Sequence, residues 1–498
     1  MPEVFTSHVP LYAVAVSLVA VPFILGTSRW PNLREFWTIA ASLVKFGCVL
    51  SLLPEVLANR VAHIELFPIA PGVSLALKAD HLGVFFALIA SGLWIFTSFY
   101  SIGYVRGLDE HKQTRYFASF AVCLSATIGI AFAANLLTFL IFYEILTIAT
   151  YPLVIHKETP AAISAGRKYL LYTLSAGVLM LGAVAWTYQL AGSLDFIAGG
   201  LLDGVTAPQT TIATLFFLFL CGVGVKAAIM PLHSWLPTAM AAPTPVSALL
   251  HAVAVVKSGV FGVVRVVGFV FGPSVMMSIG LNDILMFFAG ATIILASLLA
   301  LREDNLKRRL AYSTIGHLSY IVLGVAMLSP ASFAGGLMHI ATHATMKITL
   351  FFCAGAIYVH AHKENVSDLD GIGRIMPWTM GAFTLGAVGL AGIPPINGFS
   401  SKWLLGVGAW ESESIVSLII LLVSGLLNAA YLFPIVHRAF FRAPTNSGPP
   451  REASMLMVVP IVSTACVSVL FGLWPNLFFH FYDLSSSIAA SILGSGGQ

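Results

Sequence analysis

Residues 215–237 read LFFLFLCGVGVKAAIMPLHSWLP, and this stretch decides what kind of fold the chain has. Eleven uncharged residues lead to Lys226, and four more separate that lysine from Pro231. A proline inside a helix removes a backbone hydrogen bond and bends or ends the helix. The stretch therefore predicts a membrane-spanning helix that carries a buried ammonium group and is broken shortly after it.

The composition indicates the class of protein. The chain has 498 residues, of which 58% are hydrophobic and 9% are charged. Soluble domains carry about 25% charged residues, so we expect an integral membrane protein with many spans. The net charge of +4 is spread over short loops, which excludes a nucleic-acid-binding patch. Because no basic segment precedes residues 10–28, we interpret them as a retained span and not as a signal peptide.

Hydropathy predicts the number of spans, because a bilayer core is crossed by about 20 apolar residues of helix. We expect an all-α polytopic membrane protein with about fourteen transmembrane helices. The predicted spans are residues 10–28, 36–54, 81–103, 116–133, 135–155, 169–191, 211–230, 245–271, 282–301, 310–328, 333–360, 377–396 (continuing brokenly to 410), 414–437 and 455–482.

The loops predict the orientation. If the N-terminus is outside, the outer loops hold only Arg60 and Lys78, and all other loop lysines and arginines are cytoplasmic. Positive charge is enriched in cytoplasmic loops. We therefore expect a multi-pass protein of the cell membrane, of the bacterial inner-membrane type, with both termini on the outer (periplasmic) side.

Two predicted spans, the seventh and the twelfth, share an interruption. The helix-breaking prolines are Pro231 and Pro237 in the first, and Pro394 and Pro395 in the second. Lys226 precedes the first break and Lys402 follows the second. Broken helices at matching positions in two halves mark the ion pathway of inverted-repeat transporters. The expected divisions are residues 1–110 (three helices), 111–275 and 276–440 (two inverted five-helix repeats, helices 4–8 and 9–13) and 441–498 (helix 14).

Several ionisable residues fall inside predicted spans. The cationic ones are Lys45, Lys226, Lys257, Arg265, Lys347 and Lys402, and Glu144 is the one acid placed deep in a span. Each such residue at the bilayer centre costs about 2.5–3.5 kcal/mol on insertion scales. Some of them could form purely structural ion pairs, but a set this large favours an ion pathway. Arg265 lies near a helix end, where we expect it to extend towards the interface.

Histidines extend this polar set. His339, His343 and Lys347 follow one another at four-residue intervals, which places them on one helix face, and His317 lies in the preceding span. His339 and His343 have the spacing of a zinc site, but no glutamate of the HExxH type lies between them and a lysine continues the face. A proton relay is the favoured interpretation. His251 and Lys257 are six residues apart, on different faces, and His251 is equally compatible with a core position.

Cofactor motifs are missing from the sequence. The five cysteines lie apart in apolar runs, which argues against CxxC metal or iron–sulfur ligation and against a disulfide framework. The glycines of GVGVK at 222–226 lie inside a span and are unsuited to cradling a phosphate. We expect no cofactor and no metal site in this chain.

Four stretches carry a family resemblance: HSWLPTAMAAPTPVSALLHAVAVVKSG, LKRRLAYSTIGHLSYIVLG, HATMKITLFFCAGA and GLAGIPPINGFSSKW. Together they resemble the antiporter-like subunits of respiratory complex I, of Mrp-type cation/proton antiporters and of membrane-bound hydrogenases, over about residues 80–440. The resemblance implies fourteen helices with two inverted repeats. It also implies that redox centres lie in other subunits.

The resemblance also implies roles for single residues. Glu144 matches the glutamate that pairs with the lysine of the seventh helix, here Lys226. His251 and Lys257 match the two positions used for the linking residue of the eighth helix. Lys347, with His343 and His339 beside it, matches the lysine of the eleventh helix, and Lys402 matches the terminal residue near the exit half-channel. Lys45 has no implied role.

The branch of the family is suggested by two features. The longest members carry a lateral amphipathic helix after helix 14, and this chain ends shortly after its last predicted span. The stretch HKENVSDLDGIGRIMPW at 362–378 is similar to Mrp antiporter components of the D type. Both favour an Mrp D-like or hydrogenase-like branch.

We expect a proton-translocating subunit that works with other membrane subunits of a complex I-like or Mrp-like assembly, surrounded by lipids. Whether sodium moves as well is left open. The alternatives are a stand-alone secondary transporter for cations or solutes, and a structural scaffold without transport. Retention of Glu144, Lys226, Lys257 and Lys402 argues against a scaffold, since buried charge is unfavourable without a function.

Overall fold

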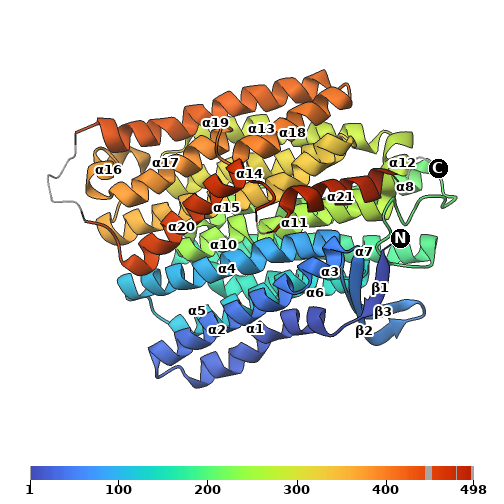
Figure 1. Ribbon diagram of the computed structural model, residues 1–498, viewed down its shortest axis with the longest axis horizontal. Helices are drawn as coiled ribbons and strands as arrows, with labels where there is room; N and C mark the ends of the chain where they lie inside the picture. The colour runs from blue at the N-terminus through green and yellow to red at the C-terminus, as the bar shows by residue number, and fades with distance from the viewer. Residues whose placement is uncertain (1, 444–450, 478, 495–498) are drawn as a thin grey trace.

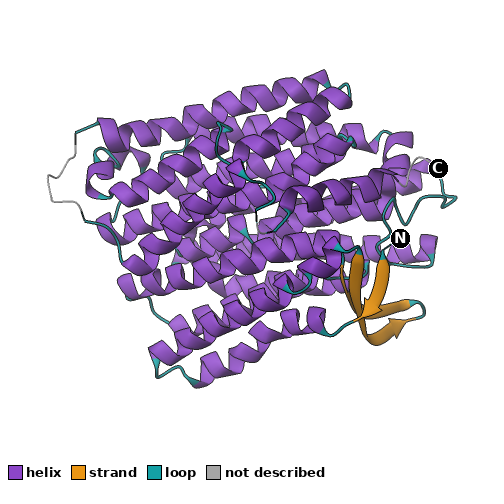
Figure 2. Cartoon of the chain, in the orientation of Figure 1, coloured by secondary structure: helices purple, strands orange, loops and turns teal. Residues whose placement is uncertain are grey.

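The computed structural model describes residues 2–443, 451–477 and 479–494, and these form a bundle of long helices aligned with one axis (Figures 1 and 2). The described part of the chain holds twelve helices that are long and apolar enough to cross a membrane. The predicted class, a helical multi-pass membrane protein, is confirmed. The count of fourteen stays a prediction, since the remaining two expected spans are a more polar helix and a pair of short helices.

The N-terminal part contains three long helices and a small sheet. The helices are α1 (Val9–Gly26), α2 (Pro31–Leu50) and α4 (His81–Gly107), with the short α3 (Leu53–Leu57) after α2. Strand β1 (Glu3–Thr6) pairs in parallel with β2 (Arg60–Ala70), which pairs antiparallel with β3 (Val73–Ala79). The sheet was not expected, because a search for twenty-residue apolar runs does not reveal strands. The alternation of apolar residues in VSLALKA at 73–79 is the unused signal.

The next group of helices surrounds the first break. It consists of α5 (Gln113–Ala131), α6 (Leu136–Val154), α7 (Pro160–Ala191), α8 (Gln209–Ala227), the short α9 (Trp235–Thr238) and η1 (Ala239–Ala241), α10 (Thr244–Ala252), α11 (Val255–Arg265), the π-helical turn η2 (Val266–Phe271) and α12 (Gly272–Ser278). Helix α8 ends in a left-handed residue, Ala228, before Pro231 is reached, and Pro237 lies in α9. Trp235 Nε1 donates to the Val225 carbonyl at 2.7 Å, which satisfies one group in the last turn of α8.

The following group surrounds the second break. It consists of α13 (Leu281–Arg302), α14 (Leu306–Ala326), α15 (Pro330–Ala361), η3 (Val366–Asp368), α16 (Ile372–Ile375), α17 (Pro377–Ala391), α18 (Gly398–Glu411) and α19 (Ile415–Phe441). Pro394 and Pro395 lie between α17 and α18, where Gly392 has the positive φ of 91° that favours glycine. The inverted symmetry of the two groups stays a prediction.

The predicted span 245–271 lies within residues 244–278, which are long and apolar enough to cross a membrane. Its helix is interrupted between α10 and α11, at Val253 and Ala254, and this interruption was not expected. No proline or glycine marks the interruption, so sequence patterns carry no signal for it. Gly259 of α11 packs directly on the end of α8, since a Cβ there would lie 2.1 Å from the Ala227 nitrogen. Helices α8 and α11 therefore approach each other at the level of Lys226.

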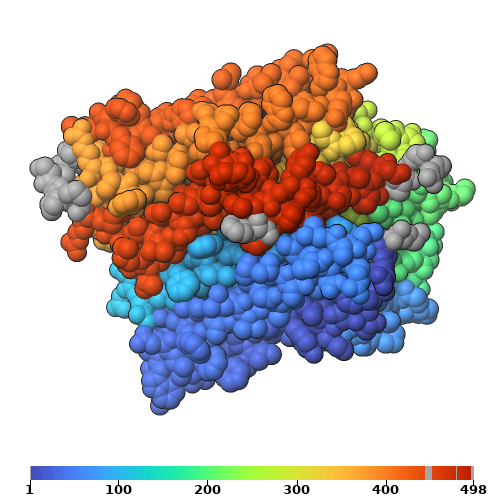
Figure 3. Space-filling view, viewed as in Figure 1, coloured from blue at the N-terminus to red at the C-terminus, as the bar shows by residue number. Residues whose placement is uncertain are grey.

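The predicted last span 455–482 is wrong in its extent. Helix α20 (Met455–Leu473) ends early, and a separate helix α21 (Phe481–Leu493) follows. Residue 478, which lies between these two helices, is outside the described residues. Figure 3 shows α20 and α21 (red) running between the N-terminal helices (blue) and the group of α17 to α19 (orange). Figure 1 shows β1 and α21 at the same end of the bundle; the membrane side on which this end lies stays a prediction.

The core of the bundle is formed by two central segments. Residues 244–278 and helix α15 contain spanning windows that are entirely buried, whereas α1, α7 and α19 expose most of theirs. The exposed residues of the outer helices are apolar, for example Val178, Leu422 and Leu426. Contact with lipid requires an apolar exterior. Polar side chains within the membrane therefore gather in the central segments.

Candidate functional site

Fully buried lysines on three different helices are the central residues of the candidate site. Lys226 on α8, Lys257 on α11 and Lys347 on α15 have no exposed surface, and Lys402 on α18 is half-buried. Lys45 on α2 is also fully buried, but it donates to Ser17 of α1 at 2.6 Å and faces the Trp94 ring of α4. It joins the N-terminal helices and lies outside the group described below.

Lys226 and Glu144 are close but do not form the expected pair. The Lys226 ammonium donates to the Tyr143 carbonyl of α6 at 2.6 Å and lies 3.3 Å from the centre of the Tyr143 ring. The Glu144 carboxylate packs against Gly177 of α7, and its Oε1 is buried without a hydrogen-bond partner among the described residues. The pairing implied by the family resemblance is therefore absent from this conformation, in which the backbone carbonyl and the aromatic face hold the cation instead.

His251 and Lys257 lie on either side of the interruption between α10 and α11. Within the described part of the chain, the Lys257 Nζ is buried without a hydrogen-bond partner, and so are both ring nitrogens of His251. The His251 ring packs against Phe351 of α15 with the ring centres 4.7 Å apart. Buried polar groups without partners are rare in proteins and unfavourable by about 1–3 kcal/mol each, so His251 and Lys257 are the members of the site that most need a further polar partner, such as water.

Three histidines form a cluster between α14, α15 and α18. His317 Nδ1 and His339 Nε2 are 3.0 Å apart, and His339 Nδ1 is 2.8 Å from the Ser401 hydroxyl. The His343 ring lies 5.4 Å from the His317 ring, centre to centre. The three histidines expected from helix spacing are thus brought together, with Ser401 as a partner that sequence reasoning missed.

Lys347 belongs to a second branch, built from hydroxyl groups. Its ammonium donates to the Ser313 hydroxyl at 2.8 Å, which is 2.8 Å from the Tyr431 hydroxyl. Tyr431 in turn donates to Asn428 Oδ1 at 2.6 Å. The single hydroxyl proton of Tyr431 is donated to Asn428, so in the contact between Ser313 and Tyr431 the serine must be the donor. All three hydrogen bonds therefore run in one direction, away from Lys347. Sequence reasoning missed Ser313, Asn428 and Tyr431; an asparagine within the apolar helix α19 is the signal that it left unused.

The hydroxyl branch reaches Lys402 through a shared carbonyl. Asn428 Nδ2 lies 3.3 Å from the Leu390 carbonyl, and the Lys402 ammonium donates to the same oxygen at 2.6 Å. The Lys402 ammonium also faces the Tyr320 ring, 5.1 Å from its centre, and the His317 ring stacks on Tyr320. Lys402 is therefore the point where the histidine cluster and the hydroxyl branch meet.

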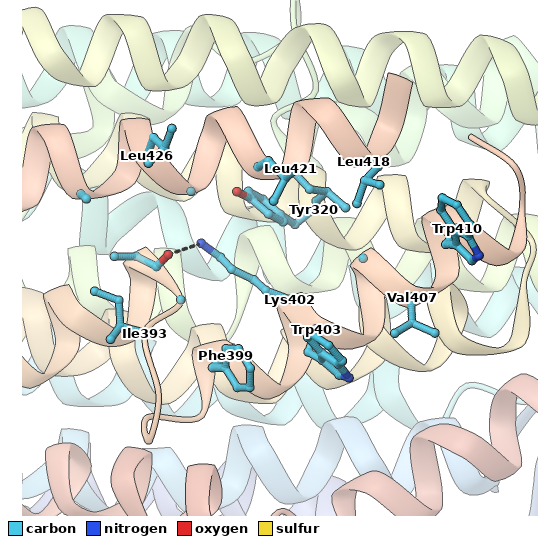
Figure 4. A pocket seen from close by; sticks show the side chains of 16 residues that line it. Tyr320, Ile393, Phe399, Lys402, Trp403, Val407, Trp410, Leu418, Leu421 and Leu426 are labelled. Carbon is cyan, nitrogen blue, oxygen red and sulfur yellow. Dashed lines mark hydrogen bonds between the residues drawn. The ribbon is translucent and has the colours of Figure 1, made fainter. Parts of the chain in front are cut away.

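Lys402 also borders a cavity on the outer face of the bundle. The cavity has a volume of about 620 Å³ and lies between α18 and α19 (Figure 4). Its walls are apolar apart from Lys402 and the Tyr320 hydroxyl, and Trp403, Trp410 and Leu426 line it while being largely exposed. Figure 4 shows the Lys402 side chain pointing across the cavity, with its hydrogen bond to the Ala391 carbonyl drawn as a dashed line. This end of the polar group therefore borders a cavity that opens to the surroundings of the bundle.

Arg265 differs from its prediction. It does not extend to the interface but is fully buried, and it binds both carboxylate oxygens of Asp80 at 2.6 and 2.9 Å. Asp80 also accepts from the Gly83 amide at the start of α4. A bidentate pair of this kind holds α4 and α11 together. Sequence reasoning missed Asp80, because it lies just outside a span and its partner is remote along the chain.

The sequence contains no motif that binds a cofactor. In the part of the chain that the structure describes, the cysteines do not form a cluster either. The five cysteines, Cys48, Cys123, Cys221, Cys353 and Cys466, are all free. The predicted absence of a cofactor stays a prediction.

The fold and the site define a class: a multi-pass membrane protein whose lysines, histidines and glutamate lie inside the bundle, as in proteins that move ions. The model of the family described as "NADH:quinone oxidoreductase/Mrp antiporter, TM" matches residues 133–428. The chain belongs to this family, and the predicted relationship is confirmed.

Relatives come from several kinds of complex. NADH-quinone oxidoreductase subunit N of Desulforudis audaxviator is 30% identical, covering 94% of this chain and 96% of that protein. Hydrogenase-4 component B of Escherichia coli is 30% identical over 80% of this chain, which corresponds to 62% of that protein. The solved Mrp complex from Dietzia sp. contains a chain with the same fold, at a TM-score of 0.86, 21% identity and 98% and 97% coverage. The branch within the family stays a prediction.

Proposed function

We propose that this chain moves protons along a line of buried residues, as one subunit of a multisubunit complex in a bacterial inner membrane. The line runs through Glu144, Lys226, His251, Lys257, His317, His339, His343, Lys347 and Lys402. The observation that carries the proposal is the full burial of Lys226, Lys257 and Lys347, with no carboxylate of the described residues hydrogen-bonded to any of them. An unpaired ammonium in an apolar interior readily gives up its proton, which is the property that a relay needs.

The first step of the proposed mechanism is a switch between Glu144 and Lys226. In the present conformation the lysine is held by Tyr143 and the carboxylate by its contact with α7. Moving the carboxylate to the ammonium would stabilise the charged lysine, and moving it back would favour proton release. The break after α8 supports this role, because backbone groups freed there can be satisfied by water at membrane depth.

Later steps pass the proton from Lys257 to Lys347 and then to Lys402. The hydroxyls of Ser313 and Tyr431 support transfer from Lys347, since they are hydrogen-bonded in one direction. The histidine cluster supports a parallel route, because imidazole both accepts and donates protons near neutral pH. Water around His251 and Lys257 would complete the connection from the first group of helices.

Membership in a larger complex rests on the relatives, whose names are those of oxidoreductase and hydrogenase components. The energy for transport would come from partner subunits. Protons are the proposed ion. The same transport measurement decides whether sodium is exchanged as well, by comparing proton movement with and without sodium.

Lys226→Met, expressed in the native complex, is the main test. We expect proton pumping by inverted membrane vesicles to be lost while the complex still assembles, because methionine keeps the volume and removes the proton site. Lys45→Met is the matched control: an equally buried lysine outside the proposed line, which should pump normally per assembled complex. Full pumping by an assembled Lys226→Met complex would refute the proposal.

A further inference from the structure

One cluster of ionisable side chains lies apart from the proposed line. Glu110 and His111 are in the turn between α4 and α5, and His156 is in the turn between α6 and α7. Each offers one ligand atom, and these three atoms lie within 4.8 Å of one another. Figure 1 shows that α4 runs from the sheet towards the opposite end of the bundle, so the cluster lies at the end remote from β1. The two turns are distant in sequence, which is why spacing motifs do not reveal them.

His156 is the central member of the cluster. Its side chain is fully buried, yet neither ring nitrogen has a partner at hydrogen-bonding geometry among the described residues, although the main chain of His111 is near. Its Nε2 lies 3.8 Å from Glu110 Oε2, and its ring stacks on His111 with the centres 5.1 Å apart. A buried imidazole with two unpaired nitrogens is unfavourable unless a ligand is bound to it.

Charged side chains surround the cluster. Arg115 donates to the main-chain carbonyl of His156 at 3.3 Å. Glu158 is engaged by Lys112 and Arg115 at 2.7 Å, and it also lies 3.7 Å from His111 Nε2. One carboxylate offsets only one of these two cations, so Glu110 is the acid that the cluster itself supplies to face a bound cation.

We propose that Glu110, His111 and His156 bind a divalent transition-metal cation of the zinc type. Two imidazoles and one carboxylate match the preference of zinc, whereas calcium and magnesium favour oxygen ligands. Bonds of about 2.0–2.2 Å place tetrahedral ligand atoms about 3.4 Å apart, so the widest separation in the cluster must contract by about 1.4 Å. The exposed His111 side chain would make that movement by leaving Glu158, which lies 3.7 Å from its Nε2, and its exposure leaves the fourth position to water.

A bound cation would have a mechanical consequence. It would fasten the α4–α5 turn to the α6–α7 turn, beyond the end of α6. Helix α6 also carries Tyr143 and Glu144, so the site would restrain the helix whose carboxylate is proposed to move. The metal site itself does not depend on the proposed proton pathway.

Cobalt(II) is a suitable probe, because its visible absorption is strong in four- or five-coordinate sites and weak in water. The sample is the full chain in its native complex, purified through a tag without histidines. We expect one equivalent of Co²⁺ to give strong absorption that Zn²⁺ abolishes. Glu110→Gln and His111→Gln should each weaken binding by about tenfold or more, since each removes one of three ligands.

His362→Gln is the matched control, since His362 is an exposed histidine that follows α15 and lies outside the cluster. It should bind Co²⁺ as the unmodified complex does. His111 is exposed, so His111→Gln is expected to fold, and its monodispersity is checked before titration. Weak, octahedral-type absorption in the unmodified complex would overturn the proposal, as would equal affinity in His111→Gln and His362→Gln.

Discussion

The Lys226 ammonium lies 3.3 Å from the centre of the Tyr143 ring, while the carboxylate of the next residue, Glu144, packs against Gly177 on another helix. The lysine and the glutamate interact electrostatically without forming a hydrogen bond to each other. The carboxylate must therefore move before the two groups can form an ion pair. This arrangement differs from a permanent structural salt bridge, which would hold both groups in one state.

Gly177→Ala tests whether the position of the carboxylate matters. A Cβ at residue 177 would lie 2.5 Å from Glu144 Oε1, so the flexible carboxylate must move away. We expect assembly to be unchanged and pumping to fall by roughly tenfold, which corresponds to a barrier raised by about 1.4 kcal/mol. Gly182→Ala, on the same helix with no atom within 4 Å of the new Cβ, is the control. Identical pumping by the two variants would contradict the switch.

Tyr431→Phe tests the hydroxyl branch. The substitution keeps the ring and removes the group that joins Ser313 to Asn428, so the connection from Lys347 is interrupted. We expect slower pumping and a loss of stability of about 1–3 kcal/mol from the unpaired buried partners. Pumping rates of Tyr431→Phe, Ser313→Ala and the double variant would be compared. If both hydroxyls serve one route, the two effects on rate will not add; additive effects would indicate separate roles.

Asp80→Asn tests the buried ion pair with Arg265. Removing one charge leaves the guanidinium buried without its counter-ion, which costs about 3–5 kcal/mol in comparable pairs. We expect a clear fall in the thermal stability of the purified chain. Arg265→Lys should also be destabilising, because an ammonium does not reproduce the two-pronged contact. The exposed pair of Arg60 and Glu55 provides the control: Glu55→Gln should change stability by about 1 kcal/mol or less.

Gly259→Ala tests the approach of α11 to α8. The added methyl group would meet the backbone of Ala227 at 2.1 Å, and a backbone cannot rotate away as a side chain can. We expect destabilisation of about 1–3 kcal/mol and loss of pumping, because the end of α8 carries Lys226. Gly47→Ala, on α2 with no atom within 4 Å, should be neutral in both thermal-stability and pumping measurements. Normal pumping by Gly259→Ala would show that the close contact is dispensable.

Much of the architecture follows from local sequence. Apolar runs predict the long helices to within a few residues at many ends, for example α1, α8 and α13. The prolines around Pro231 and Pro394 predict that two helices are interrupted, although α8 ends before its proline is reached. These features depend on neighbouring residues alone: a bilayer demands a continuous apolar helix, and a proline opposes one. The expected histidine grouping on α15 likewise follows from the repeat of the helix.

Other features are decided by residues remote from one another in the chain. The interruption at Val253 and Ala254 has no breaking residue, and the separate helix α21 follows an apolar run that looked continuous. The partners of buried charges are equally hard to predict from the sequence. Arg265 pairs with Asp80, and Lys226 donates to the Tyr143 carbonyl rather than to Glu144. Hydropathy measures how apolar a segment is, but not which group faces a buried charge.

By itself, the sequence determined that this is a helical multi-pass membrane protein of a known family, with ionisable residues in its spans. Only the tertiary structure decided which of those residues are held by neutral groups, that Ser313 and Tyr431 connect Lys347 towards Lys402, and that His156 meets Glu110. The physical reason is that insertion into a membrane depends on each segment's own composition. The state of a buried charge depends on the few atoms around it, which the packing of distant helices brings together.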